Sequence, residues 1–377
     1  MRRWLLILCG ASALVAGCSQ STPSGITIPE PESPNPGASS SSAPADGSFS
    51  VLATGDVLIH PALTEQATKD GDGTRDFTEM FSGVRSTVEA ADLAICHLEV
   101  PLANADGPFS GFPTFAAPPE VATALASVGY DTCSTASNHT FDKGFEGART
   151  TLDVLDKADI GHTGSARSEK ESKKPLITDV NGVKVGQVAY TFGYNVGTEP
   201  PEAWMGNVLD VDRVLAAARA AKKAGAQVVI ASLHWGNEDQ SKPTPFQRQT
   251  ARKLLADPAI DLIVGHHAHV VQPFERINGK WVAYGLGNQI ARHEEPRGTT
   301  EEGVMARFRF SRGPNGWTVQ QAEYIPTLVD LGPPIRLRNL ATDTSVERKR
   351  RAEALVRTDR VALSLGAAED GLTRPGE

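Results

Sequence analysis

Residues 49–56, Phe-Ser-Val-Leu-Ala-Thr-Gly-Asp, form a short apolar stretch that runs directly into Gly55 and Asp56. Two comparable stretches follow at residues 92–98 and 130–135. The segments between them carry apolar residues at helical spacing. Strands that alternate with helices are typical of a mainly parallel sheet, so the first half of the chain predicts an α/β fold. The predicted helices are residues 77–90, 119–128 and 145–158.

The second half of the chain adds hairpins to this pattern. Asn181-Gly182 separates the apolar runs 176–180 and 183–191, and Asn-Gly in this setting is a strong signal for a type I′ β-hairpin. Two further Asn-Gly pairs predict hairpins over residues 274–282 and 304–324. Two packed sheets with helices on the outer faces would accommodate this order. The other predicted elements are helices at 211–224 and 245–256 and strands at 227–233 and 262–264.

The first 17 residues have the features of an export signal. Arg2 and Arg3 precede an apolar run, residues 4–15, that is too short to span a bilayer as a stable helix. The run leads into Ala16-Gly17-Cys18, which resembles the processing site of bacterial lipoproteins, where cleavage precedes the lipidated Cys. An ordinary secretory signal is the alternative. We expect residues 1–17 to be a lipoprotein signal peptide and lipidated Cys18 to anchor the protein on the extracytoplasmic face of a bacterial membrane.

Composition divides the rest of the chain. Residues 18–48 are rich in Ser and Pro, and Ile26 and Ile28 are their only large aliphatic residues, which predicts a disordered tether. Residues 49–333 form the expected folded domain, and residues 334–377 a charged C-terminal extension. A formal net charge of −8 argues against a main role in binding nucleic acid, so no nucleic-acid partner is expected.

Seven of the nine histidines lie in short motifs that each follow a predicted strand. Open α/β sheets bind ligands at the carboxyl ends of their strands. Carboxylates and imidazoles without thiolates suit Zn, Mn or Fe. Alternation along a strand also places both ends of each His-x-Glu or His-x-His triplet on one face. The motifs are Gly55-Asp56 with His60; His97-Leu98-Glu99; Ser137-Asn138-His139 with Asp142; His234-Trp235-Gly236; and Gly265-His266-His267-Ala268-His269.

Together with residues 285–288, Gly-Leu-Gly-Asn, these motifs resemble those of the CapA family. That family is linked to poly-γ-glutamate and capsule biosynthesis and has the fold of the calcineurin-like metallophosphoesterases. The resemblance extends over residues 51–324. It implies a four-layer, metallophosphoesterase-like α/β sandwich, in which two mixed β-sheets are flanked by helices. It also implies a site for two divalent metal ions, with Mn, Fe and Zn as the candidates.

The resemblance implies a role for each candidate residue. Glu99 would bridge the two metal ions, and His139 would protonate a leaving group or hold a phosphoryl oxygen. Asp142 would orient the imidazole of His139. These groups would support attack by metal-activated water on a phosphate ester. The remaining implied ligands are Asp56 and His269 for one metal ion, and Asn138, His234 and His267 for the other.

The motifs also depart from the superfamily pattern. Leu58 occupies the position of a superfamily histidine, and the nearest histidine is His60. His97 stands where the family usually has Asn. For His60 and His97, two alternatives therefore stay open: a weaker metal ligand, or no role at the site. Alternation turns His266 away from His267, and we expect it to be structural or to support the ligands. Simpler roles also stay open, as helix caps for Asp56 and Asn138 and as a core imidazole for His234.

These observations lead to one functional expectation and one alternative. We expect a membrane-tethered, CapA-like protein of capsule or poly-γ-glutamate biosynthesis that is a metal-dependent phosphoesterase-type hydrolase. The alternative is a non-catalytic protein that keeps the fold and binds, exports or anchors the polymer. The expected partners are an anionic envelope polymer or its precursor, the membrane through Cys18, and other capsule-synthesis proteins.

Three further features lie outside the predicted site. Cys96 and Cys133 lie within two apolar runs that are interpreted as strands; a disulfide, which requires these strands to be neighbours, and two buried free thiols both stay open. His162 and His293 are interpreted as surface or loop residues. The basic run at residues 348–351 is interpreted as the solvated face of a surface helix.

Overall fold

The computed structural model describes residues 47–376. The predicted signal peptide, Cys18 and all of the tether except its last two residues lie outside the described residues. Within the described part, no helix is both long enough and apolar enough to cross a membrane.

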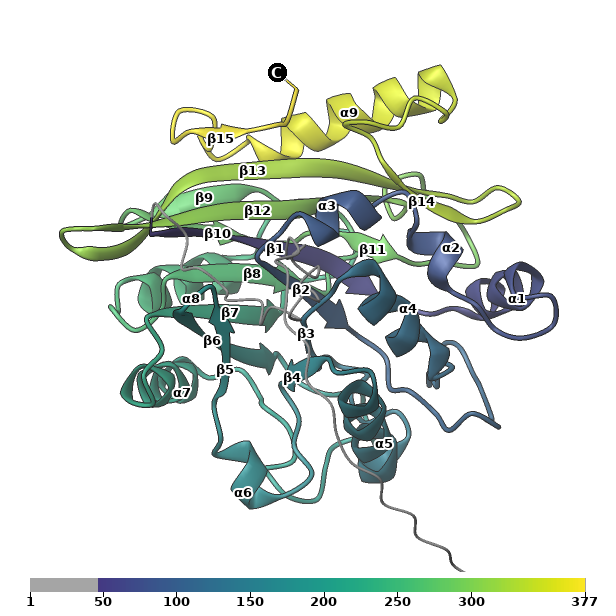
Figure 1. Cartoon of the computed structure of the whole chain (residues 1–377), viewed down its shortest axis with the longest axis horizontal. Helices are drawn as coiled ribbons and strands as arrows, with labels where there is room; N and C mark the ends of the chain where they lie inside the picture. The colour runs from purple at the N-terminus through teal and green to yellow at the C-terminus, as the bar shows by residue number, and fades with distance from the viewer. Residues whose placement is uncertain (1–46, 377) are drawn as a thin grey trace, which may run out of the picture. The chain divides into compact units, whose positions relative to one another are not determined.

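Nine strands within residues 47–376 form the larger of two mixed β-sheets (Figure 1). They are β1 (Ser48–Val57), β2 (Leu93–Leu98), β3 (Thr132–Ser134), β4 (Gly161–Thr163), β11 (Asn288–Ile290), β12 (Glu302–Gly313), β13 (Gly316–Asp330), β14 (Arg336–Asn339) and β15 (Leu372–Thr373). The order is β14-β13-β12-β1-β2-β3-β4, with β11 paired to β1 and β15 to β13. β1 is parallel to β2 and antiparallel to β12, so the sheet is mixed.

Six strands of the described chain form the smaller sheet, and their order is β5-β6-β7-β8-β10-β9. They are β5 (Leu176–Val180), β6 (Val183–Thr191), β7 (Val228–His234), β8 (Leu262–His266), β9 (Phe274–Ile277) and β10 (Lys280–Ala283). β6, β7, β8 and β10 are parallel, and β5 and β9 are antiparallel edge strands. Asn181 and Gly182 both have positive φ, 54° and 84°, as a type I′ hairpin requires.

The two sheets share one apolar core. From β1, the side chains of Phe49, Val51 and Ala53 enter this core because alternate residues of a strand share a face. The smaller sheet contributes alternate residues in the same way, among them Val228 and Ile230 of β7. All five side chains are buried, so the packing of the two sheets rests on apolar contacts between their inner faces.

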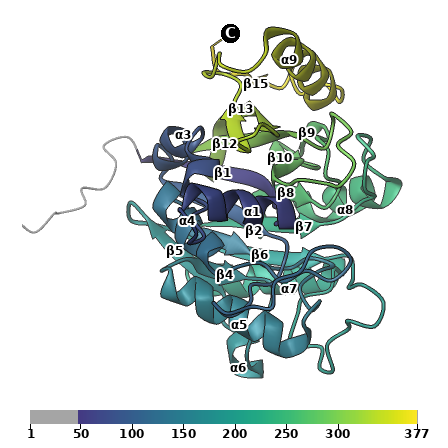
Figure 2. The same ribbon diagram turned by 90° about the vertical axis from the view of Figure 1, so that its right-hand side faces the viewer.

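Helices cover the outer face of each sheet (Figure 2). α1, α2, α3, α4 and α5 pack on the larger sheet, whereas α7 and α8 pack on the smaller one. The expected four-layer sandwich of two mixed sheets flanked by helices is therefore confirmed. The helices are α1 (Pro61–Asp70), α2 (Thr78–Phe81), α3 (Arg85–Glu89), α4 (Glu120–Val128), α5 (Gly144–Lys157), α6 (Glu169–Ser172), α7 (Val211–Lys223), α8 (Pro245–Leu255) and α9 (Arg348–Ala362).

The prediction of a single helix over residues 77–90 is wrong. Two short helices, α2 and α3, occupy this segment and are separated at Gly83. Gly83 forms a β-bridge with Arg338, and a Cβ at Gly83 would lie 2.4 Å from the carbonyl oxygen of Leu337. This close approach to β14 interrupts the helix, and the apolar spacing of the segment does not reveal it.

The segment after residue 333 takes part in the fold. β14 and β15 both pair with β13, and α9 packs over β12 and β13 (Figure 2). The C-terminal residues thus lie against the larger sheet, where they contribute two strands and one helix.

Cys96 and Cys133 form a disulfide bond. They are register partners on the neighbouring parallel strands β2 and β3, with a Cα–Cα distance of 4.5 Å. The structure therefore decides between the two alternatives that the sequence leaves open. The bond joins the two strands that carry His97 and Ser134 at the next register position.

Replacing both cysteines in a Cys96→Ala/Cys133→Ala variant is expected to lower the free energy of unfolding by about 3–4 kcal/mol, because the bond closes a long loop in the unfolded chain. Chemical denaturation with and without reductant measures this difference. The wild type should respond to reductant and the variant should not. Equal stability of the reduced and oxidised wild type would contradict the expectation.

Candidate metal centre

The ends of strands from both sheets meet at the candidate site. Asp56 on β1 is the register partner of His97 on β2, and His234 on β7 is the partner of His266 on β8. The two pairs touch across the sheets, because His97 Nε2 lies 3.0 Å from His234 Nδ1. The sandwich therefore brings together side chains that are far apart in the sequence, such as Asp56 and His266, which are 210 positions apart.

Asp56 is fully buried among imidazoles. Its Oδ1 lies 3.3 Å from His266 Nδ1 and its Oδ2 lies 3.2 Å from His269 Nδ1. The backbone N–H of His267 also donates to Oδ2, at 3.2 Å. Burial raises the pKa of Asp56, but the imidazoles of His266 and His269 beside its carboxylate outweigh burial and hold the pKa well below its ordinary value. Asp56 is thus an ionised carboxylate at neutral pH.

Glu99 is buried, and its carboxyl group makes no hydrogen bond to the described residues. Among residues 47–376, neither carboxylate oxygen has a hydrogen-bond partner, although His269 Nε2 lies 3.5 Å from Oε1. Burial raises the pKa of Glu99 well above its ordinary value. A buried carboxyl group without hydrogen bonds is costly, and a cation between Glu99 and its neighbours would remove that cost.

Asn138, His234 and His267 lie beside one another in the implied second set. His234 Nε2 is 2.8 Å from Asn138 Oδ1, and the rings of His234 and His267 are 4.6 Å apart. Burial lowers the pKa of His267 to about 3 and that of His234 well below its ordinary value. Both imidazoles are therefore neutral at neutral pH, which is the form that binds a metal ion.

The unpaired polar atoms fit a divalent cation. Five buried atoms at the site lack a hydrogen-bond partner, although buried polar atoms usually have one. Carboxylate oxygens and neutral imidazole nitrogens are the donors that Zn, Mn and Fe accept. Among the described residues, two triplets place donor atoms within 4.8 Å of one another: Asp56, His97 and His266; and Glu99, His267 and His269. The unpaired atoms are Asp56 Oδ1, Glu99 Oε1 and Oε2, His266 Nδ1 and His267 Nδ1.

His139 and Asp142 form a buried dyad beside the ligand candidates. His139 Nδ1 lies 2.6 Å from Asp142 Oδ2, which also accepts the backbone N–H of Phe115 at 2.7 Å. Asn195 Nδ2 lies 3.1 Å from the same ring nitrogen. The dyad fixes the orientation of the ring, and His139 lines a cavity. Its second nitrogen, Nε2, can then serve a ligand in that cavity.

His97 belongs to the donor triplet that also contains Asp56 and His266. Its Nδ1 lies 2.7 Å from Ser134 Oγ, and its Nε2 faces His234 Nδ1. Both ring nitrogens therefore have a hydrogen-bond partner. These contacts allow two roles for His97: it can orient His234, and it can bind a metal ion together with Asp56 and His266, whose donor atoms lie within 4.8 Å.

His60 is not brought into either triplet. It precedes α1, its Nδ1 lies 3.2 Å from the carbonyl oxygen of Leu58, and its ring contacts Phe115 and His293. Burial lowers the pKa of His60 to about 3. His60 therefore forms part of the cavity wall and does not replace the histidine that is missing at Leu58.

His266 faces Asp56, contrary to the expectation of a residue turned away from the ligands. Residues 262, 264 and 266 share the inner face of β8, whereas the strand ends before His267. His267 and His269 have positive φ, 90° and 54°. Such backbone conformations are strained for residues with a Cβ and occur often at functional sites. The alternation along β8 could have predicted this orientation, because His266 shares a face with the apolar residues Leu262 and Val264.

Asn288 ends the Gly-Leu-Gly-Asn motif, and the sequence predicts no role for it at the metal site. Its Oδ1 lies 3.0 Å from His269 Nδ1, and its Nδ2 donates to the carbonyl oxygen of Thr300 at 2.8 Å. It is also the register partner of Asp56 on β11. Asn288 is therefore a buried residue that orients His269.

A cavity of about 680 Å³ opens beside the metal-ligand candidates. Its size is sufficient for a ligand of several hundred cubic ångströms. His293, expected as a loop residue, lines this cavity, and burial lowers its pKa to about 4. The other lining residues include His60, Phe112, Phe115, His139, Glu238, His269, Arg292 and Arg297.

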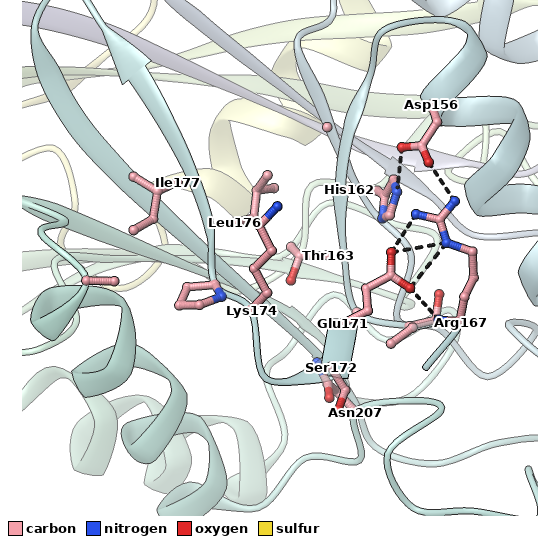
Figure 3. Close-up of a pocket in the computed structure, with 16 residues that line it drawn as sticks. Asp156, His162, Thr163, Arg167, Glu171, Ser172, Lys174, Leu176, Ile177 and Asn207 are labelled. Carbon is pink, nitrogen blue, oxygen red and sulfur yellow. Dashed lines mark hydrogen bonds and ion pairs between the residues drawn. The ribbon is translucent and has the colours of Figure 1, made fainter. Parts of the chain in front are cut away.

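His162 lies in a different cavity, of about 540 Å³ (Figure 3). Its Nε2 is 3.0 Å from Asp156, and Arg167 forms ion pairs with Asp156 and Glu171. Figure 3 shows these groups directed toward one another. Their charges are satisfied within the group, and none of the lining residues is a metal-ligand candidate.

The family described as "Bacterial capsule synthesis protein PGA_cap" matches residues 50–293 of the chain. The chain belongs to this family. The matched segment contains all six ligand candidates and the His139–Asp142 dyad. The resemblance to the CapA family that the motifs indicate is therefore confirmed.

Two relatives carry the CapA name. The capsule biosynthesis protein CapA of Bacillus anthracis is 29% identical over 219 residues, which cover 57% of this chain and 52% of the relative. The PGA biosynthesis protein CapA of Bacillus subtilis (strain 168) is 29% identical over 199 residues, covering 52% of this chain and 51% of the relative. The chain thus spans about half the length of these relatives.

Similar solved structures include two with 16% identity or less. A novel phosphatase from Mycoplasma pneumoniae is 14% identical, with a TM-score of 0.47, and the match covers 75% of this chain and 94% of that protein. The calcineurin-like phosphoesterase YfkN from Bacillus subtilis is 16% identical, with a TM-score of 0.45, and the match covers 84% and 97%.

Binding of divalent metal ions is expected to release protons from this site. Burial raises the pKa of Glu99, and for His269 the neighbouring Glu99 and Asp56 outweigh burial and raise the pKa to about 10. Both groups must lose protons to bind a metal ion, so affinity should increase with pH up to about 10, with about one to two protons released at neutral pH.

Calorimetric titration of Mn²⁺ or Zn²⁺ in two buffers with different ionisation enthalpies measures this number. A Glu99→Gln variant should release fewer protons, and a His162→Ala variant should match the wild type. Binding without net proton release would contradict the expectation.

Proposed function

We propose that this protein is a metal-dependent hydrolase of the phosphoesterase type that acts on an anionic envelope polymer, capsule or poly-γ-glutamate, or on its precursor. The observation that carries the proposal is the pair of buried, unpartnered oxygens of Glu99 between the two sets of ligand candidates. The names of the relatives support the polymer, and the donor set supports the metal dependence.

The residues fit two divalent ions of the Mn, Fe or Zn type. Such ions, when bound, lower the pKa of water and stabilise the charge that develops on a phosphoryl group. Glu99 would contact both ions, because its donor atoms lie within 4.8 Å of those of His269 in the first set and His267 in the second. The first ion would be held by Asp56, Glu99 and His269, and the second by Glu99, Asn138, His234 and His267.

His139 is the candidate acid for the leaving group. Asp142 accepts a hydrogen bond from His139 Nδ1–H, which leaves Nε2 as the atom that could give a proton to a leaving oxygen in the cavity. The backbone N–H of Phe115 holds the second position on Asp142 Oδ2. The orientation of the imidazole is therefore fixed before a substrate arrives.

A non-catalytic protein that binds, exports or anchors the polymer is the second candidate. It is favoured by Leu58, which leaves the first ion one imidazole short of the superfamily pattern. In that case the same donors would bind cations that mediate contact with an anionic polymer, because the chain itself carries a net charge of −8.

We also propose that lipidated Cys18 anchors the protein on the extracytoplasmic face of a bacterial membrane. The sequence Ala16-Gly17-Cys18 after a short apolar run supports this proposal. The Ser- and Pro-rich residues 19–48 would give the folded domain reach from the membrane. Other capsule-synthesis proteins are the proposed protein partners in this location.

A His139→Ala variant is expected to lower kcat for a phosphodiester by about 10²- to 10⁴-fold while the metal content stays at the wild-type level, because this residue transfers a proton and does not bind a metal ion. An Asp142→Asn variant should lower kcat less than this. Turnover by the full chain of a phosphodiester with an alkyl leaving group, which needs a proton to depart, measures kcat, and elemental analysis of each variant measures the metal content.

His162→Ala is the matched control, since His162 also contacts an aspartate but lies in the other cavity. Its kcat should equal that of the wild type. A wild type that binds metal ions but turns over neither phosphomonoesters nor phosphodiesters would contradict the hydrolase and favour the polymer-binding candidate.

A further inference from the structure

We infer that Arg350 on the C-terminal helix α9 is a positioning residue for the metal centre, acting through the segment 298–302 and Asn288. The expected effect on metal binding rests on the proposed function, whereas the contacts of Arg350 are independent of it. The family match ends at residue 293, so α9 and this segment lie beyond it.

Glu302, the first residue of β12, receives two arginines from α9. Arg357 binds its carboxylate through both Nε and Nη2, at 2.9 and 2.7 Å, and Arg350 Nη1 donates to Oε1. Glu302 is 3% exposed, so a buried carboxylate is paired with two half-buried guanidinium groups. Bidentate pairs between arginine and carboxylate fix geometry as well as charge.

Arg350 makes one contact that Arg357 does not. Its Nη2 donates to the carbonyl oxygen of Gly298 at 2.7 Å. Gly298 N in turn donates to Glu301 Oε2 at 2.6 Å, and Thr300 Oγ1 donates to Glu301 Oε1 at 2.8 Å. Arg350 therefore holds both ends of the segment 298–302, whereas Arg357 holds only Glu302.

This segment leads directly to a metal-ligand candidate. The carbonyl oxygen of Thr300 accepts a hydrogen bond from Asn288 Nδ2 at 2.8 Å, and Asn288 Oδ1 lies 3.0 Å from His269 Nδ1. The same connection between β11 and β12 carries Arg292 and Arg297, which line the cavity. A displacement of the segment would move the residue that orients His269 together with one wall of the cavity.

Four exposed positions of α9 provide the contrast. Arg348, Ala352, Val356 and Arg360 are spaced four residues apart and face away from the sheet, with Val356 67% exposed. The inward positions include Ala354, Thr358 and Ala362, which are buried. The basic run at 348–351 is therefore not simply a solvated face, because Arg350 is directed toward Glu302 and Gly298.

The test compares Arg350→Ala with Arg357→Ala in the full chain. Each variant removes one of the two ion pairs of the buried Glu302 carboxylate, so both should be less stable than the wild type. Only Arg350→Ala loses the contact with Gly298, and it should weaken binding of one Mn²⁺ or Zn²⁺ ion by about 10-fold or more, the effect typical of losing a residue that orients a ligand. Arg350→Lys should restore part of this loss, and Arg348→Ala should match the wild type.

Hydrogen exchange of the metal-free proteins gives a second readout. Amides of residues 268–269 and 298–302 should exchange faster in Arg350→Ala than in Arg357→Ala, with α5 unchanged in both. Equal metal affinity in the two variants, or equal exchange in these segments, would overturn the inference. A wild type that binds no metal ion would overturn the proposed function instead, and hydrogen exchange alone would then decide the inference.

Discussion

The buried carboxyl group of Glu99 is the constraint on which the candidate site depends. It lies at the end of β2, is 1% exposed, and has no hydrogen-bond partner on either oxygen. A protein interior tolerates such a group only at a cost of several kcal/mol unless a counter-charge is supplied. The neutral imidazoles of His234 and His267 cannot supply that charge, and the charged imidazole of His269, 3.5 Å away, does not hydrogen-bond to it. Divalent cations can supply it. The unpaired carboxyl group thus destabilises the metal-free protein, and the same group forms part of a metal site that exists before the metal ion binds.

The packing of the two sheets is what makes this arrangement possible. Asp56 and Glu99 come from the larger sheet, and His234, His267 and His269 come from the end of the smaller sheet or the turn that follows it. Within the larger sheet, the pairing of β1 with β11 requires a glycine, because a Cβ at Gly55 would lie 2.1 Å from the carbonyl oxygen of Gly287. The disulfide between β2 and β3 fixes the register one residue before His97 and Ser134. The apolar core therefore determines the position of the polar site.

The sequence predicted the two-sheet fold because its signals are local. Apolar strands followed by polar motifs, and Asn-Gly pairs between apolar runs, depend on neighbouring residues, and their positions agree with the strands and hairpins of the structure. The placement of Asp56, Glu99, Asn138, His234, His267 and His269 near one another also followed from their positions after strands.

The features that the sequence did not reveal depend on contacts between distant segments. Gly83 ends a helix because it touches β14, and His266 faces Asp56 because the strand ends before His267. Arg350 appeared to belong to a solvated basic run, but its partner is a buried glutamate 48 positions earlier in the chain. Spacing along the chain carries no information about such partners, because they are set by the packing of whole sheets and helices.

The measurement that tests the central claim most directly is a crystal structure of the full chain grown with Mn²⁺, with anomalous diffraction recorded to locate the metal ions. The account predicts two anomalous peaks, one beside Asp56, Glu99 and His269 and the other beside Glu99, Asn138, His234 and His267, with Glu99 between them. Anomalous peaks elsewhere, or none near Glu99 in a protein with the described fold, would contradict the claim that this buried carboxyl group is the centre of a two-metal site.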